Sequence, residues 1–173
     1  MNILSVIKNF FINNLIVIIF YFLSFSSFEG IKEFSDLVIF SFNLPMIIIY
    51  FFILKFPDRL GLGHIFLGGI FNDVVIGIPL GASSLSYLIL AFFTSYIRNA
   101  TLRSKMTAEW TTFIPTLFFS NLVYFFTINN FSHLSFFYLE LLRSTFFTFL
   151  FFPFFYFIFI NYQKSFLKDN AQF

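Results

Sequence analysis

Cysteine is absent from this chain of 173 residues, and charged residues make up only 10% of it. Without cysteine there is no disulfide framework, no thiolate metal site and no cysteine nucleophile. Charged side chains form about a quarter of a typical soluble domain, so this chain has too few to cover a surface that faces water. We therefore expect neither a soluble globular protein, nor a disordered chain, nor a nucleic-acid-binding protein.

Apolar residues make up 59% of the chain instead, and the mean hydropathy is +0.89. A helix needs about 20 mainly apolar residues to cross ~30 Å of hydrocarbon. Helices satisfy their own backbone hydrogen bonds in lipid, so we predict an all-α fold. The prediction is one domain over residues 1–173, a polytopic integral membrane bundle of six transmembrane helices. The predicted spans cover residues 10–28, 37–54, 60–78, 80–97, 110–128 and 136–160.

The distribution of Lys and Arg predicts one orientation in the membrane, because these residues accumulate in cytoplasmic loops. With the N-terminus inside, the cytoplasmic segments contain all the Lys and Arg residues except Lys32, which lies outside, and Arg143, which lies in the sixth span. An even number of spans then returns the C-terminus to the same side. We predict that both termini are cytoplasmic.

Glycine is concentrated in one part of the chain, since six of the seven glycines fall between Gly61 and Gly81. Small residues mark helix faces where two backbones approach closely in a membrane. We therefore predict that the third span is central to the bundle. The segment around Pro79, flanked by Gly77 and Gly81, is typical of a tight external turn between the third and fourth spans.

Three charged residues, Asp73, Glu140 and Arg143, lie inside predicted spans, where an unpaired charge is costly. With a rise of ~1.5 Å per residue, Asp73 in the third span and Arg143 in the sixth lie at about the same depth in the outer half of the bilayer. One hypothesis is that they pair across the bundle, with Asn72 or Glu140 completing the hydrogen bonding. The alternatives are a local pair between Glu140 and Arg143, three residues apart on one helix, and a path for a substrate or proton.

The remaining polar motifs indicate structure rather than catalysis. Pro57 ends the second span, and Asp58 is then positioned to cap the third. No His, Asp and Glu cluster has ligand spacing, and neither a nucleophile elbow nor a phosphate-binding loop is present. We therefore predict no enzyme activity, no metal and no cofactor. The 35 phenylalanines, including the run from Phe151 to Phe159, are interpreted mainly as bulk that faces lipid.

The glycine, aspartate and proline spacing resembles the MreD family, the rod shape-determining membrane proteins of bacteria. The motif residues cover about a fifth of the chain. The size of the chain, the number of predicted spans and their orientation extend the resemblance to nearly all of it. The residues that carry it are Pro57, Asp58, Arg59, Gly61, Gly69, Asp73, Gly77, Pro79, Gly81, Ala82, Ser86 and Tyr87.

The resemblance implies a non-enzymatic scaffold in the cell-elongation complex that supports lateral peptidoglycan synthesis. Its implied partners are an MreC-like bitopic protein, a RodA-type polymerase with its transpeptidase, and MreB-like filaments. The implied fold is similar to the substrate-binding membrane subunits of energy-coupling-factor transporters, and the motif residues would be packing and turn positions. We expect a partner helix to dock on the glycine-rich third span with Ala82, Ser83 and Ser86 of the fourth.

A second hypothesis comes from a different class of protein. The chain would be the substrate-binding membrane subunit of a small-molecule transporter, with Asp73, Asn72 and Arg143 lining an outward-facing pocket. An ion or proton conductor that uses Asp73 is a weaker third alternative, because one buried carboxylate is not a relay.

Overall fold

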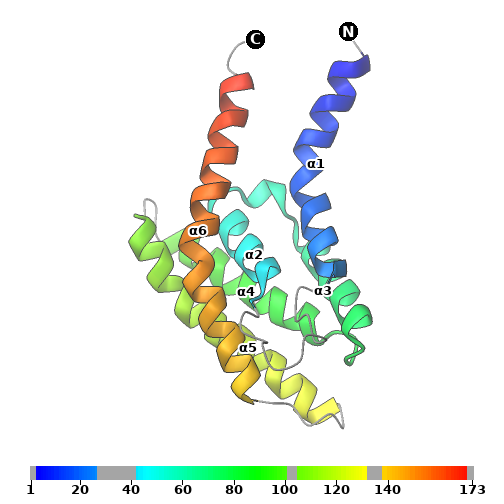
Figure 1. Cartoon of the computed structure of the whole chain (residues 1–173), viewed down its shortest axis with the longest axis vertical. Helices are drawn as coiled ribbons and strands as arrows, with labels where there is room; N and C mark the ends of the chain where they lie inside the picture. Colours follow the sequence, from blue (N-terminus) through cyan, green and yellow to red (C-terminus); the bar gives the residue numbers. More distant parts are fainter. Residues whose placement is uncertain (1–2, 27–41, 101–104, 132–137, 171–173) are drawn as a thin grey trace, which may run out of the picture.

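The computed structural model describes residues 3–26, 42–100, 105–131 and 138–170, and the side chains of 14–25, 42–100, 105–130, 139 and 141–162. The described residues are all-α and contain no strand (Figure 1). One helix forms in each of the six apolar stretches, in the predicted order. The helices are α1 (Ile3–Ser26), α2 (Leu44–Lys55), α3 (Leu62–Ile76), α4 (Ala82–Ala100), α5 (Met106–Phe131) and α6 (Tyr138–Asn170), with a 3-10 turn η1 (Pro57–Arg59) between α2 and α3.

Among the described residues, two helices have a segment long and apolar enough to cross a membrane, Met106–Asn130 in α5 and Leu141–Tyr162 in α6. The predicted second and third spans are shorter in the structure. Asn43 caps the start of α2, where its Oδ1 accepts a hydrogen bond from the Met46 N–H at 3.2 Å. With 12 residues in α2 and 15 in α3, these helices are about 18 and 22 Å long at ~1.5 Å per residue.

The central helix is α2, and the prediction that the glycine-rich third span is central is wrong. All nine residues from Pro45 to Ile53 are buried. A helix that is apolar all round is stable only when other elements surround it. Here α1, α4, α6 and η1 pack against α2, whereas α3 exposes Leu62, Phe66 and Val74.

Small residues bring α3 and α4 into close contact. A Cβ added at Gly69 would lie 2.4 Å from the Cα of Ser84 on α4, and one added at Gly68 would lie 2.3 Å from the Phe20 ring of α1. The prediction that the glycines mark a close helix interface is confirmed, but this interface is internal. Ala82, Ser83 and Ser86 are also buried, so the expected groove for a partner helix on α3 and α4 is already filled by the chain itself.

Aromatic rings join α6 to α2. Phe51 meets Tyr156 edge-on with ring centroids 5.5 Å apart, and Phe159 at 5.3 Å. One turn earlier on α6, Phe152 meets Tyr50 of α2 with ring centroids 5.5 Å apart. The interpretation of the run from Phe151 to Phe159 as lipid-facing bulk is therefore only partly right, because one face of this run forms the α2–α6 interface.

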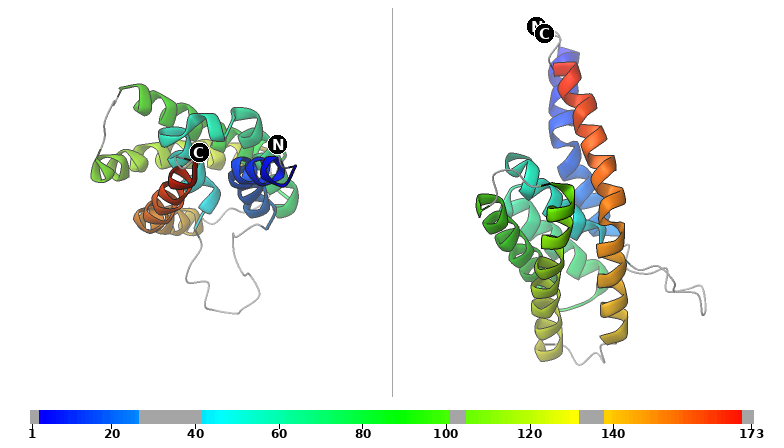
Figure 2. Two further views of the ribbon diagram at one scale, coloured as in Figure 1. Left: turned by 90° about the horizontal axis from the view of Figure 1, so that it is seen from above. Right: turned by 90° about the vertical axis from the view of Figure 1, so that its left-hand side faces the viewer.

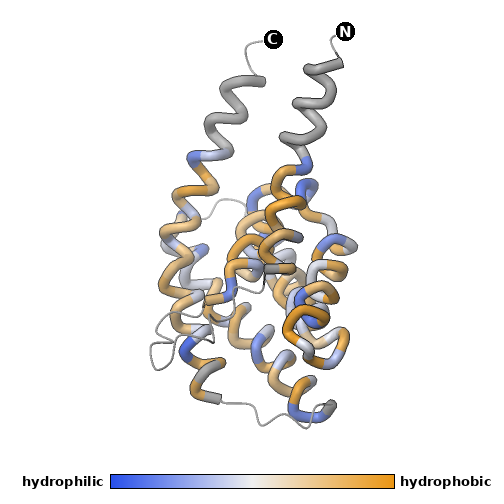
Figure 3. Tube along the Cα trace, turned by 45° about the vertical axis from the view of Figure 1, so that its right-hand side comes forward, coloured by the Kyte–Doolittle hydropathy of each residue, from blue (hydrophilic) through white to orange (hydrophobic). Residues whose placement is uncertain are grey.

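Large apolar side chains are exposed on the outside of the bundle, and part of its interior is polar. Figure 3 shows that apolar residues predominate along the described helices. Phe22, Leu80, Phe92, Phe118 and Phe146 are examples of large apolar side chains that are more than half exposed. The buried polar residues are Ser24, Asn72, Asp73, Ser83, Ser84, Ser86, Thr94, Glu109, Thr116, Ser120 and Thr148.

The ends of the helices alternate between two sides of the molecule. The start of α1 and the end of α6 project from the same side (Figures 1 and 2). The end of α2, the end of α4 and the start of α5 also lie toward that side (Figure 1). The α3–α4 turn, the end of α5 and the start of α6 lie toward the other (Figure 1).

Candidate functional site: a buried polar turn and the clusters around it

The carboxylate of Asp73 joins the end of α3 to the start of α4. Its Oδ2 accepts a hydrogen bond from the backbone N–H of Gly81 at 2.7 Å, and its Oδ1 accepts one from the backbone N–H of Ser83 at 2.8 Å. The first N–H groups of a helix have no partner within the helix and form the positive end of its dipole. Asp73, which is completely buried, therefore caps α4 from the neighbouring helix.

Backbone conformation explains why glycines flank this turn. Gly77 has a φ of +75° and Gly81 a φ of +102°, a region that residues with a Cβ adopt at a cost. Gly77 ends α3, and its N–H donates to the Asp73 carbonyl at 2.9 Å. The Ala82 N–H donates to the Pro79 carbonyl at 3.2 Å as α4 begins. The prediction of a tight turn around Pro79 is confirmed.

Asn72 and two serines extend the contact between α3 and α4. Asn72 was expected to complete the hydrogen bonding of an Asp73–Arg143 pair, but its Nδ2 donates instead to the Ser83 Oγ at 2.9 Å. The Ser84 Oγ donates to the Phe66 carbonyl at 2.9 Å. Ser86 continues the polar seam to α5, where its hydroxyl lies 2.7 Å from that of Ser120.

The predicted pair between Asp73 and Arg143 does not form. Both carboxylate oxygens of Asp73 accept backbone N–H groups, whereas the Arg143 side chain is exposed on α6. The positive end of the α4 dipole lies beside Asp73, where the hypothesis from the sequence placed the positive charge of Arg143. The side chain of Glu140 lies outside the described residues, and with it the alternative local pair.

The Pro57–Arg59 segment has a different role from the one predicted. Pro57 does end α2 at Lys55, and η1 follows. Asp58, however, is exposed and does not cap α3; the cap position is Gly61, with no side-chain hydrogen bond. The Gly61 carbonyl instead accepts the N–H groups of His64 and Ile65. Helix α3 begins at Leu62, four residues after Asp58, so this carboxylate is not at the cap position.

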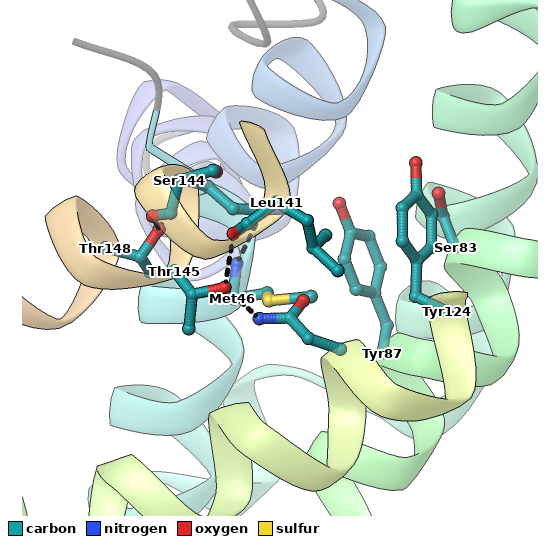
Figure 4. Close-up of a pocket in the computed structure, with 10 residues that line it drawn as sticks. Met46, Ser83, Tyr87, Tyr124, Leu141, Ser144, Thr145 and Thr148 are labelled. Carbon is teal, nitrogen blue, oxygen red and sulfur yellow. Dashed lines mark hydrogen bonds between the residues drawn. The ribbon is translucent and has the colours of Figure 1, made fainter. Parts of the chain in front are cut away.

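A small polar cavity lies between α2, α4, α5 and α6 (Figure 4). Its volume of about 20 Å³ is the room that one water molecule needs. Beside it, the Asn121 Nδ2 donates to the Thr145 Oγ1 at 2.8 Å, and the Asn43 N–H donates to the Thr148 Oγ1 at 2.8 Å. The cavity is lined by Asn43, Met46, Ser83, Tyr87, Asn121, Tyr124, Leu141, Ser144, Thr145 and Thr148.

The predicted transporter pocket is not this cavity. Asp73, Asn72 and Arg143, which were expected to line a pocket for a small molecule, are absent from its wall. Sites for small molecules of drug size have volumes of roughly 300–1,000 Å³. A cavity with space for one water molecule is far smaller. In the part of the chain that the structure describes, no group of three or more His, Asp or Glu residues could hold a metal ion.

A second buried carboxylate, Glu109 at the start of α5, escaped the sequence interpretation. It forms an ion pair with Lys55 at the end of α2, and the two side chains are 1% and 28% exposed. The Tyr50 hydroxyl donates to the Glu109 carbonyl at 2.8 Å. Nearby, Arg98 of α4 donates to the Ile53 carbonyl at 3.2 Å. The sequence did contain a signal for this ion pair: Glu109 is an isolated acidic residue in the first turn of an apolar helix, where the helix dipole favours a negative charge.

The comparisons with known proteins give no relative for this chain. No family model, curated protein or solved structure matches it.

Proposed function

We propose that this chain is a multi-pass protein of the bacterial plasma membrane with six membrane-embedded helices and both termini in the cytoplasm. The distribution of polarity supports the proposal, since large apolar side chains face outward while carboxylates, amides and hydroxyls are buried. A contiguous apolar exterior is unfavourable in water and suits lipid. Because protein surrounds α2, its 12 residues need not match the bilayer thickness.

The positions of the cations support the same orientation. Lys55, Arg59 and Arg98 lie on α2, η1 and the end of α4, toward the side from which the start of α1 and the end of α6 project (Figure 1). The α3–α4 turn, which contains no Lys or Arg, lies toward the opposite side. Positive residues are retained on the cytoplasmic side of a membrane.

We further propose that the protein acts as a non-enzymatic scaffold of the cell-elongation complex, like the MreD family that its motif resembles. One observation carries this proposal. The part of the motif from Gly69 to Gly81 joins α3 to α4: Gly69 packs on Ser84, Asp73 caps α4, and Gly77 and Gly81 have positive φ. Both Asp73 oxygens hold the helices together, so the motif supports a structural role. The proposed partners are an MreC-like bitopic protein, a RodA-type polymerase with its transpeptidase, and MreB-like filaments.

Cysteine labelling tests the membrane arrangement directly, because the natural chain has no cysteine. Single variants Leu80→Cys, at an exposed position in the α3–α4 turn, and Asp58→Cys, at an exposed position in η1, are compared. A membrane-impermeant maleimide added to spheroplasts should label Leu80→Cys, and it should label Asp58→Cys only after lysis. The reverse pattern, or equal labelling in intact spheroplasts, would refute the orientation.

Depletion of the chain in its host tests the scaffold. We expect rod-shaped cells to become round and to incorporate less fluorescent D-amino acid into the lateral wall. A tagged MreC-like protein should co-purify with the chain from detergent-solubilised membranes. Re-expression of the Asp58→Asn variant should restore shape as well as the natural chain does, since Asp58 is exposed and does not cap α3. Cells that keep their shape and elongation rate after depletion would overturn the proposal.

A further inference from the structure

Pro153 interrupts the backbone hydrogen bonding of α6. Proline has no backbone N–H, so the carbonyl four residues earlier, that of Phe149, loses its partner within the helix. The indole of Trp110 on α5 replaces that partner, since its Nε1 donates to the Phe149 carbonyl at 3.0 Å. The Trp110 and Phe149 rings also stack, with centroids 5.0 Å apart and an angle of 14° between their planes. A side chain of α5 therefore completes a backbone hydrogen bond of α6.

The parts of α6 before and after this interruption are attached to the bundle in different ways. After Pro153, aromatic rings such as that of Tyr156 pack on α2. Before it, the hydroxyls of Thr145 and Thr148 accept single hydrogen bonds from α5 and from the cap of α2, and Leu141 packs on a small apolar cluster. The outer side of this earlier part is not covered by other described residues, and the large side chains at least half exposed there are Leu142, Phe146 and Leu150.

The segment before the interruption forms one wall of the small polar cavity (Figure 4). Its lining residues recur every three or four positions and so share one face of α6: Leu141, Ser144, Thr145 and Thr148. The other walls belong to α2 with its cap, α4 and α5. Among the described residues that line the cavity none is charged, so its hydroxyl and amide groups suit an uncharged solute that forms hydrogen bonds. Outward movement of the α6 wall alone would open this cavity.

We propose that Leu141–Thr148 is a gate that turns about Pro153, and that Trp110 is the latch that keeps it closed. The proline removes the backbone hydrogen bond that would stiffen α6 at this point. The indole supplies a replacement only while α6 lies against α5. With the gate closed the cavity has space for one water molecule, and with the gate open it admits small uncharged polar solutes. The gate is a property additional to the proposed scaffold, which does not depend on it.

Cysteine reactivity tests the latch, because the natural chain has no cysteine. Ser83→Cys places a thiol on the α4 wall of the cavity, at a position 1% exposed. The matched control is Ser86→Cys, three residues along α4, which is 0% exposed and faces Ser120 of α5. The purified chain in detergent reacts with methyl methanethiosulfonate, a small uncharged thiol reagent, and mass spectrometry gives the rate.

The variant Trp110→Phe keeps an aromatic ring beside Phe149 but removes the indole donor. We expect it to accelerate the reaction of Ser83→Cys about fivefold, which corresponds to ~1 kcal/mol, the net contribution of one hydrogen bond. The reaction of Ser86→Cys should not change. A thermal melt of each variant serves as the folding control.

The variant Pro153→Ala tests the hinge. Alanine returns the N–H that pairs with the Phe149 carbonyl, so adding Pro153→Ala to Trp110→Phe should bring the rate at Ser83→Cys back to that of the natural background. Pro115→Ala, which replaces the exposed proline inside α5, should leave the acceleration in place. Pro153→Ala alone should slow the reaction of Ser83→Cys about fivefold, and this comparison remains decisive if Trp110→Phe does not fold.

Four outcomes would overturn the gate. Equal rates at Ser83→Cys with and without the indole would show that Trp110 is not a latch. A parallel increase at Ser86→Cys would show that the whole bundle loosens instead. An acceleration that Pro153→Ala leaves in place, or that Pro115→Ala also removes, would show that α6 does not turn at Pro153. A Pro153→Ala variant that reacts as fast as the natural background would show the same.

Discussion

Substitution of Gly69 by alanine tests the close packing of α3 on α4. The added Cβ would lie 2.4 Å from the Ser84 Cα and 2.5 Å from its backbone nitrogen, whereas ordinary contact begins at 3.4 Å. These are backbone atoms of a helix, so no side-chain rotation relieves the overlap, and the two helices must separate by about 1 Å. Overpacking of this kind costs roughly 1–3 kcal/mol.

Gly63, on the same helix, provides the matched control, since a Cβ there has nothing within 4 Å. Both substitutions replace glycine by alanine in a helix, which alone favours the helix by about 0.5–1 kcal/mol. This gain is similar in the two variants, so their difference isolates the overlap. At about 2–4 °C per kcal/mol for a chain of this size, Gly69→Ala should melt roughly 2–12 °C below Gly63→Ala.

The melting temperatures are measured in detergent micelles by far-ultraviolet circular dichroism, with monodispersity followed by size-exclusion chromatography. If Gly69→Ala melts at the same temperature as Gly63→Ala, or above it, α3 and α4 are not packed backbone to backbone. The role assigned to the glycines of the motif would then be wrong.

Three further substitutions are measured with the same thermal assay. Asp73→Ala removes the acceptor for two buried N–H groups and should lower the free energy of unfolding by about 1–3 kcal/mol for each of them. The control Asp58→Asn, at an exposed site, should leave the melting temperature unchanged. Equal effects of the two substitutions would contradict the capping role of Asp73. Lys55→Met leaves the buried Glu109 without its cation and should cost roughly 3 kcal/mol, the low end for a buried pair because Lys55 is partly exposed. The double variant with Glu109→Met should recover most of that loss, and a double variant less stable than Lys55→Met would refute the pairing. Gly81→Ala forces a Cβ into a φ of +102° and should cost about 1–2 kcal/mol; a stability equal to that of the natural chain would show that the turn has another conformation.

The sequence predicted the number and order of the helices because each apolar stretch is bounded by turn or polar residues that act locally. Pro57 ends α2, and Gly77 and Gly81 shape the turn that separates α3 from α4. The lengths were less accurate. The predicted second span began at residue 37, yet α2 starts after its Asn43 cap, since hydropathy alone does not mark the first residue of a helix.

The partners of the charged residues were not accessible from the sequence. A common depth made Arg143 a plausible partner for Asp73, but the carboxylate reaches only eight and ten residues along the chain, to Gly81 and Ser83. Depth along one axis leaves the rotation of each helix about its own axis undetermined, and that rotation directs Arg143 outward. The pair between Lys55 and Glu109, 54 residues apart, likewise depends on which helices are neighbours.

The amino-acid sequence by itself determined the apolar character of the chain, the six helices and the turn between α3 and α4, because these follow from local composition and from the dihedral preferences of glycine and proline. The tertiary structure alone decided that α2 is the central helix, that the aromatic rings of α6 pack inward on α2, and that Arg143 remains on the outer surface. The physical reason is that most helices of such a chain have apolar residues on several sides. Hydrophobicity then no longer distinguishes inside from outside, and the choice is left to the fit of glycine, serine and aromatic side chains between neighbouring helices.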